Sequence, residues 1–118
     1  MTRRGDVVVA VFPYVGGAGG KNRPAVVVQC DRLNGKLRNT ILAMITGNTS
    51  LVGKEPTQFL IDPATQEGQS SGLAHPSAVK CENLMTVAQS DILRTLGHLS
   101  DALKQKLDAG LKAALEVP

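Results

Sequence analysis

Residues 5–29 read GDVVVAVFPYVGGAGGKNRPAVVVQ, a pattern typical of a β-hairpin. β-Branched residues favour extended chain, so the valine-rich runs at residues 7–12 and 24–29 are expected to form strands. Pro13 ends the first run, and Pro24 suits the start of the second because the first position of a strand needs no N–H in the ladder. The glycine-rich residues 16–22 are expected to be the loop between them.

The sequence beyond this hairpin continues as short apolar runs separated by polar, glycine-containing segments. Four of these runs are expected to be strands, at residues 40–46, 58–61, 77–81 and 84–87. Residues 32–38 form a basic connection with an Asn34-Gly35 turn signal. The polar connection at residues 62–75 is long enough to suggest a functional loop, and a short helical turn is expected at residues 91–93.

The last part of the chain changes from strand to helix periodicity. Leucines recur at every fourth residue, at positions 99, 103, 107, 111 and 115, which predicts an amphipathic helix. Ser100 is placed to cap its N-terminus, and Asp101 lies in its first turn. Short strands followed by one helix predict a mainly β fold with a C-terminal helix, built on a small barrel.

Length and composition place limits on the class of protein. A chain of 118 residues is expected to form a single domain, residues 1–118, with an aliphatic core, since it has one Tyr, two Phe and no Trp. No apolar run approaches the ~20 residues that a membrane helix needs. The apolar run at residues 7–12 is too short for a secretory signal, so we expect a cytoplasmic protein that does not bind a membrane.

The two cysteines, Cys30 and Cys81, are expected to be free thiols, because cytoplasmic proteins rarely keep disulfides. Each follows a valine-containing run, so we interpret both as small, half-buried core residues. The chain has two histidines, His75 and His98, and no Cys/His cluster with metal-ligand spacing. We therefore expect no metal site and no cofactor.

Charge and motifs narrow the function further. Residues 1–54 hold eight Lys and Arg against two Asp, whereas residues 55–118 are net acidic, so a basic surface that meets a polyanion is one interpretation and solvated loops are the other. No Ser-His-Asp or Cys-His arrangement can be read from the spacing. The segment Gly16–Gly20 is not a phosphate-binding P-loop, because Arg23-Pro24 leads from it into a strand rather than a Lys-Ser/Thr helix start.

A series of short motifs covers nearly the whole chain and resembles the MazF/PemK/Kid toxin family in order and spacing. The series comprises Gly5-Asp6-Val7-Val8, Val15-Gly16, Arg23-Pro24-Ala25-Val26-Val27-Val28, Ile41-Leu42-Ala43-Met44-Ile45-Thr46, Pro56-Thr57, Gly72-Leu73, Ser77-Ala78-Val79-Lys80-Cys81-Glu82, Thr86-Val87 and Gly97-His98-Leu99. The resemblance implies the SH3-like small β-barrel of CcdB/MazF-type plasmid maintenance toxins.

The resemblance also implies an activity. Members of the family are sequence-specific, metal-independent endoribonucleases that cleave single-stranded RNA, including mRNA, and so inhibit growth. In this reaction the ribose 2′-OH attacks the adjacent phosphate and leaves a 2′,3′-cyclic phosphate and a 5′-hydroxyl. Arg23 and Thr46 match the two central catalytic positions. We assign Arg23 to stabilising the transition-state charge, because a guanidinium stays protonated at any working pH.

Further residues are expected to bind RNA by their position in the matched motifs: Lys21, Ser77, Lys80 and Glu82. Each could equally be a plain surface residue. The proton acceptor for the 2′-OH stays open, because Ala18 and Gly19 stand where many members carry Glu-Gln. Glu82 is one candidate and a surface carboxylate is the alternative reading. His75 is a candidate by residue type, since an imidazole can accept a proton, but it matches no family motif.

The resemblance implies two protein partners: a second copy in a homodimer, and a cognate antitoxin with an acidic, disordered tail that blocks the RNA groove. Two other functions share this fold class. A CcdB-like toxin would poison DNA gyrase without catalysis, but Arg23-Pro24 and Ile45-Thr46 are features of the endoribonucleases. An SH3-like adaptor would need an aromatic peptide groove, which three aromatic residues cannot line.

Overall fold

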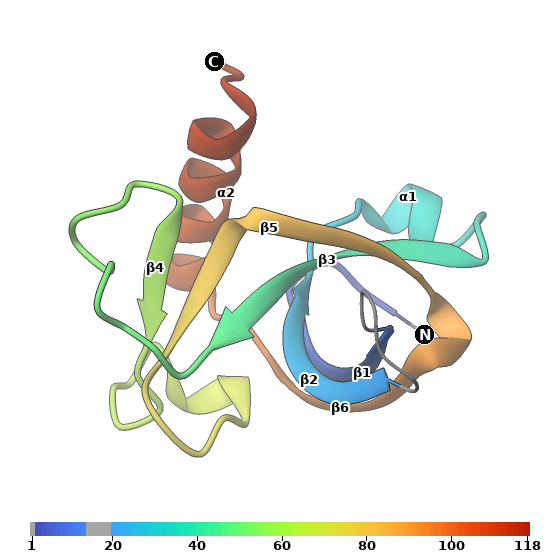
Figure 1. Cartoon of the computed structure of the whole chain (residues 1–118), viewed down its shortest axis with the longest axis horizontal. Coiled ribbons are helices and arrows are strands. Elements are labelled where there is room, and N and C mark those ends of the chain that lie inside the picture. The colour runs from blue at the N-terminus through green and yellow to red at the C-terminus, as the bar shows by residue number, and fades with distance from the viewer. Residues whose placement is uncertain (1, 14–19) are drawn as a thin grey trace.

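The computed structural model describes residues 2–13 and 20–118. Its elements follow one another along the chain as strands with short helices between them and one long helix at the end (Figure 1). In chain order they are β1 (Asp6–Pro13), β2 (Gly20–Val27), α1 (Asp31–Asn34), β3 (Asn39–Thr46), β4 (Gln58–Ile61), the 3₁₀ helix η1 (Gln69–Ser71), β5 (Ser77–Ala88), the 3₁₀ helix η2 (Gln89–Asp91), β6 (Ile92–His98) and α2 (Asp101–Leu115).

All six strands belong to one sheet, in the order β4-β5-β3-β2-β1-β6, and each neighbouring pair is antiparallel. Figure 1 shows this sheet curling, with β1, β2 and β6 on the side away from β4 and α2. The order leaves β4 and β6 as its two edges, so the curl is open rather than closed into a complete barrel. The predicted class, a mainly β fold with a C-terminal helix, is confirmed.

The longest strand, β5, corrects one sequence-based expectation. Residues 77–81 and 84–87 were expected to be two strands, but they belong to one strand of 12 residues. Its register against β3 shifts between Ala43, which pairs with Leu84, and Met44, which pairs with Lys80. Residues 81–83 of β5 are therefore extra residues of a bulge, which bends a strand without ending it.

Two further predictions from the sequence were wrong at element boundaries that depend on pairing between strands. β2 begins at Gly20, so Lys21 and Asn22 lie in a strand rather than in the expected loop, whose residues 16–19 fall outside the described part of the chain. The helical turn expected at residues 91–93 lies earlier, as η2, and β6 follows it. Apolar and polar residues do not alternate regularly in residues 92–98, so the sequence carries little strand signal there. These residues form a strand through their hydrogen-bonded pairing with β1.

The curled sheet buries apolar residues on both faces. One cluster lies between the sheet and α2, and includes Val79, Cys81, Leu99, Leu103 and Leu107. The other lies inside the curl and is built by Val8, Ala10, Phe12, Ala25, Val27, Leu42 and Val87. Because alternate residues of a strand point to opposite faces, strands that are apolar on both sides can serve both clusters.

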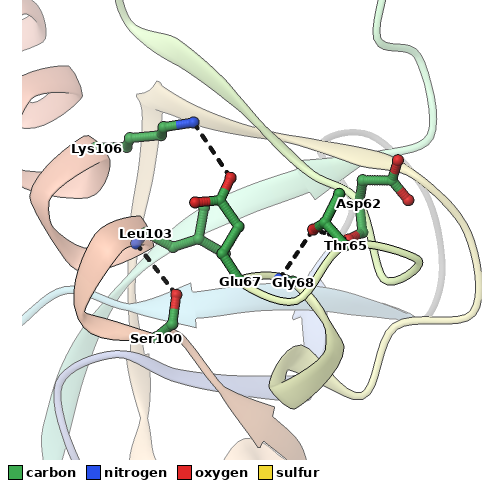
Figure 2. Close-up of polar contacts among 7 residues, drawn as sticks. All are labelled: Asp62, Thr65, Glu67, Gly68, Ser100, Leu103 and Lys106. Atoms are coloured by element: carbon green, nitrogen blue, oxygen red, sulfur yellow. Dashed lines mark hydrogen bonds and ion pairs between the residues drawn. The ribbon is translucent and has the colours of Figure 1, made fainter.

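The C-terminal helix agrees with its prediction and is fixed at its start. The Ser100 hydroxyl accepts a hydrogen bond of 3.3 Å from the Leu103 N–H, which caps the helix as expected (Figure 2). Lys106 reaches Glu67 of the long polar connection at 3.6 Å, an exposed ion pair that contributes little by itself. In the same connection the Gly68 N–H donates to the Thr65 hydroxyl at 3.1 Å. The part of this connection around Glu67 therefore lies beside the first turns of α2.

Gly97 shows why this segment needs a small residue opposite it. A Cβ built on Gly97 would lie 2.1 Å from the carbonyl oxygen of Ser70 in η1. Backbone atoms cannot move aside as a flexible side chain does, so β6 and η1 can approach this closely only at a glycine.

None of the helices in the described residues is long and apolar enough to cross a membrane.

The packing of α2 gives the first prediction. Leu107→Ala removes a fully buried side chain from the cluster beneath the helix, and we expect it to lower the free energy of unfolding by about 2–5 kcal/mol. Leu115→Ala, on the same helix but with 58% of the side chain exposed, is the matched control and should stay within about 0.5 kcal/mol. Urea unfolding of both variants measures the difference; equal losses would contradict the packing described here.

Candidate functional site

A row of side chains crosses four strands of the sheet on one face. Ala25 of β2 pairs with Met44 of β3, Met44 pairs with Lys80 of β5, and Lys80 pairs with Gln58 of β4. Directly paired residues of antiparallel strands project to the same side. The row therefore joins the curled part of the sheet to its β4 edge, and the bulge in β5 sets which residue stands opposite Met44.

Arg23 and Thr46 lie on the same face as this row. Each is two residues along its strand from a member of the row, Arg23 from Ala25 and Thr46 from Met44, so the period of a strand brings both to that side. Together they line one pocket of about 200 Å³, whose full lining is Arg23, Met44, Ile45, Thr46, Lys80 and Asn83. Residues far apart in sequence thus meet at one place.

The charge of this pocket comes from two cations. Arg23 is exposed and Lys80 is half-buried. Among the described residues, neither side chain has a hydrogen-bond or ion-pair partner. A guanidinium presents a planar fork of donors and an ammonium is a compact point charge, so the two suit different oxygens of one phosphate. The pocket is therefore suited to binding a phosphate group.

Thr46 adds a polar group between the two cations. Its Oγ1 accepts a hydrogen bond of 3.1 Å from the backbone N–H of Asn48. A hydroxyl has one proton to donate as well as lone pairs that accept, so this contact leaves the proton of Thr46 able to reach a ligand. Thr46 and Lys80 also line a second, smaller pocket of about 80 Å³, together with Asn48, Ser50, Leu51 and Gln58.

Glu82 lies two residues beyond Lys80 and is held by two neighbours. Its Oε1 accepts from the Thr57 hydroxyl at 2.9 Å and its Oε2 accepts from the Gln58 amide at 2.7 Å. Partial burial acts to raise the pKa of this carboxyl. Hydrogen bonds from its own backbone, Gln58 and Thr57, together with the charge of Lys80, outweigh that effect and lower the pKa below its ordinary value. Glu82 is therefore a carboxylate at neutral pH.

The other residues expected to bind RNA are placed differently. Lys21 is exposed, two residues before Arg23 on β2 and on the same face, but outside the two pocket linings. Ser77 is buried, and its hydroxyl donates to the backbone carbonyl of His75 at 3.0 Å. Ser77 lies three positions before Lys80 in a regular strand segment, and an odd offset turns its side chain to the opposite face. His75 is exposed just before β5.

Several polar residues at this site were not singled out from the sequence. Gln58, Thr57, Asn48 and Asn83 come from three different segments and become neighbours only through the register of β3, β4 and β5. The one signal in the sequence was the polar residue at the start of the apolar run 58–61. In the described part of the chain, no group of three or more His, Cys, Asp or Glu residues could hold a metal ion.

The fold is shared with solved structures of bacterial toxin endoribonucleases. An endoribonuclease in complex with its cognate antitoxin from a mycobacterial species superposes with a TM-score of 0.76 and 20% identity, covering 100% of this chain and 98% of the other. The toxin MazF-mt6 of Mycobacterium tuberculosis gives a TM-score of 0.74 with 23% identity, over 96% of this chain and 98% of the other. At this level of identity the likeness establishes the fold, which is that of the MazF class of toxin.

Sequence comparison takes the assignment further. The model of the PemK-like, MazF-like toxins of type II toxin–antitoxin systems matches residues 3–115, and the chain belongs to this family. Endoribonuclease MazF6 of Mycobacterium tuberculosis is 31% identical over 89% of this chain and 88% of its own length. Endoribonuclease EndoA of Bacillus subtilis is 30% identical over 98% and 95%. The resemblance drawn from the short motifs is thus confirmed.

The two thiols differ sharply in their surroundings. Cys81, between Lys80 and Glu82, is a core residue as expected, although it is fully buried rather than half-buried. Cys30 is exposed, so its interpretation as a half-buried core residue was wrong. Cys30 directly precedes α1, where the chain leaves the sheet. Burial, and then the nearby charge of Glu82, raises the pKa of the Cys81 thiol to about 12.

This difference predicts selective labelling. Only a thiolate attacks Ellman's reagent, so at pH 8 the folded chain should react at one thiol, Cys30, and the urea-unfolded chain at both. Cys30→Ser is the control and should leave the folded chain unreactive. Rapid labelling of folded Cys30→Ser would show that Cys81 is open to solvent and would contradict the packing of α2 on β5.

Proposed function

We propose that the chain is a toxin endoribonuclease that cleaves single-stranded RNA, including mRNA, and thereby stops growth. The observation that carries the proposal is the pocket in which Arg23 and Lys80, two cations with no hydrogen bond or ion pair among the described residues, flank the Thr46 hydroxyl. The relatives named above support it, since both are endoribonucleases of the same family.

The chemistry that fits this pocket is an internal transfer at phosphorus. The ribose 2′-oxygen attacks the adjacent phosphorus while the bond from phosphorus to the 5′-oxygen of the next nucleotide breaks. The 2′-OH gives up its proton and the 5′-oxygen gains one, which leaves a 2′,3′-cyclic phosphate and a 5′-hydroxyl. Negative charge grows on the phosphoryl oxygens on the way, and preformed positive charge stabilises that transition state more than the substrate.

Each residue of the pocket has a role in this reaction. Arg23 compensates the growing charge on the phosphoryl oxygens, because a guanidinium is a permanently charged group. Lys80 holds the scissile phosphate from the β5 side of the same pocket. Thr46 donates its hydroxyl proton to a phosphoryl oxygen, with its own oxygen already fixed by the Asn48 N–H. Lys21, further along β2, binds a flanking phosphate.

Partners complete the proposal. The chain is held inactive by a cognate antitoxin, as in the solved relative that is described as a complex with its antitoxin. An acidic antitoxin tail would compete with RNA for Arg23 and Lys80 by presenting carboxylates to them. We also propose a homodimer, with RNA crossing the two-fold interface, and a cytoplasmic location, where mRNA is found. Gyrase poisoning in the manner of CcdB is not favoured, because the named relatives in this toxin family are endoribonucleases.

Removing the guanidinium tests the proposal directly. Arg23→Ala should lower the cleavage rate roughly 10²–10³-fold, the effect of losing one group that stabilises transition-state charge. A gel assay on single-stranded RNA measures it, with EDTA present, since protein cations supply the positive charge. Arg32→Ala, an exposed arginine on α1 outside the pocket, is the matched control and should cleave as the original chain does. Near-normal cleavage by Arg23→Ala, or strict dependence on a divalent ion, would overturn the mechanism.

Expression in bacteria tests the biological role. The chain expressed alone should arrest growth, and co-expression with the small open reading frame immediately upstream of its gene should restore growth, because an antitoxin tail that orders on binding can cover a large surface. The Arg23→Ala variant at the same expression level is the control and should be tolerated. Normal growth in the presence of folded, unmutated chain would count against a toxin.

A further inference from the structure

Gln58 is a buried polar residue next to the proposed cleavage pocket, on the strand that forms the β4 edge. Its side chain is only 7% exposed, and its amide Nε2 donates to Glu82 Oε2 at 2.7 Å. A buried amide lowers stability unless its donors are used, and a bond to a charged acceptor is among the stronger ones. The hydrogen bond to the Glu82 carboxylate therefore fixes the orientation of the Gln58 side-chain amide.

Each oxygen of the Glu82 carboxylate accepts one hydrogen bond. Thr57 donates its hydroxyl to Oε1 at 2.9 Å, while Gln58 serves Oε2. Thr57 is itself fixed, because its N–H donates to Glu55 and its carbonyl accepts from the Cys81 N–H at 3.0 Å. A general base works best when its pKa is near the working pH and an oxygen is open to the proton. Glu82 is exposed, but its lowered pKa and the hydrogen bond that each oxygen already accepts make it a weak proton acceptor.

The same contacts bear on Lys80. Gln58 and Lys80 are paired across β4 and β5, and both line the small pocket that adjoins the cleavage pocket. Lys80 is one of the causes that lower the pKa of Glu82, so the two charges attract each other. The other carboxylate at this corner is Glu55, which accepts from Thr57. A fixed negative charge beside a long, flexible side chain restricts where its ammonium can lie.

We propose that Gln58 is a positioning residue: with Thr57 it holds Glu82 as a fixed carboxylate, and this carboxylate orients Lys80 toward the phosphate bound between Arg23 and Thr46. Glu82 then acts as the counter-charge of Lys80 and is not the proton acceptor for the 2′-OH. The inference rests on the proposed RNA cleavage, but its first half concerns the free protein and can be tested without RNA.

The first experiment follows Glu82 by carboxyl NMR titration in the free protein. Gln58→Met keeps the volume but removes the donor to the charged form, and should raise the pKa of Glu82 by about one unit. Thr57→Val removes the other donor from a half-buried position, and should raise the pKa as well. Gln29→Met is the matched control, since Gln29 is also 7% exposed but donates to Asn34, away from this site. An unchanged pKa of Glu82 in both test variants would overturn the proposal.

The second experiment measures kcat and KM for single-stranded RNA against pH. Gln58→Met should lower kcat about tenfold, the effect of one hydrogen bond to a charged group, and should move the acid limb of the kcat profile upward with the pKa of Glu82. Gln29→Met should change neither. Glu82→Gln should lower kcat by a similar factor and raise RNA affinity, because it removes a negative charge beside a phosphate site.

These results separate the two roles of Glu82. If Glu82 were the proton acceptor, Glu82→Gln would lower kcat roughly 10²–10⁴-fold, and the proposal would be wrong. A Gln58→Met variant whose kcat matches that of Gln29→Met would also overturn it. If the unmutated chain cleaves no RNA, the proposed function fails instead, and the NMR titration still decides whether Gln58 and Thr57 hold Glu82 as a carboxylate.

Discussion

The pairing of β5 with its two neighbours is the constraint on which the rest of the structure depends. β5 forms a ladder with β3 along both halves, and its first half also pairs with β4. The bulge at residues 81–83 fixes Lys80 opposite Met44, and a register shifted by one residue would turn Lys80 to the α2 side and Cys81 to the pocket. One irregularity in one strand thus decides which side chains face the proposed site.

That constraint is stable because both faces of the sheet are packed. The cluster under α2 and the cluster inside the curl draw on alternate residues of the same strands, so a slip in register would expose apolar side chains on both faces at once. The side chains of Val79 and Cys81 are buried on the α2 side of β5. Because side chains alternate along a strand, Lys80 between them must point to the opposite face. The apolar core therefore positions the polar site.

Local sequence patterns predicted the elements whose signal is local. The leucine repeat gave α2 with its Ser100 cap, and the valine runs gave the hairpin strands. Motif resemblance placed Arg23 and Thr46 together, and the structure does bring them to one pocket. Strand β6 and the contact of Gln58 with Glu82 could not be predicted from such patterns. Both depend on pairing between strands that are far apart in the sequence. Such pairing leaves no periodic pattern or fixed motif spacing from which it could be predicted.

A pocket with two cations and no carboxylate between them has a cost for the free protein, because like charges repel when they are brought together. The fold reduces that cost unequally. Arg23 lies in solvent, where water screens its charge, whereas Lys80 is half-buried and has the carboxylate of Glu82 nearby. Since Glu82 is held by Thr57 and Gln58 rather than by Lys80 itself, it lowers the repulsion without closing an ion pair over the ammonium. Under the proposed function, the pocket is thus preformed for phosphate in the free protein, and no salt bridge of Arg23 or Lys80 has to break when RNA binds.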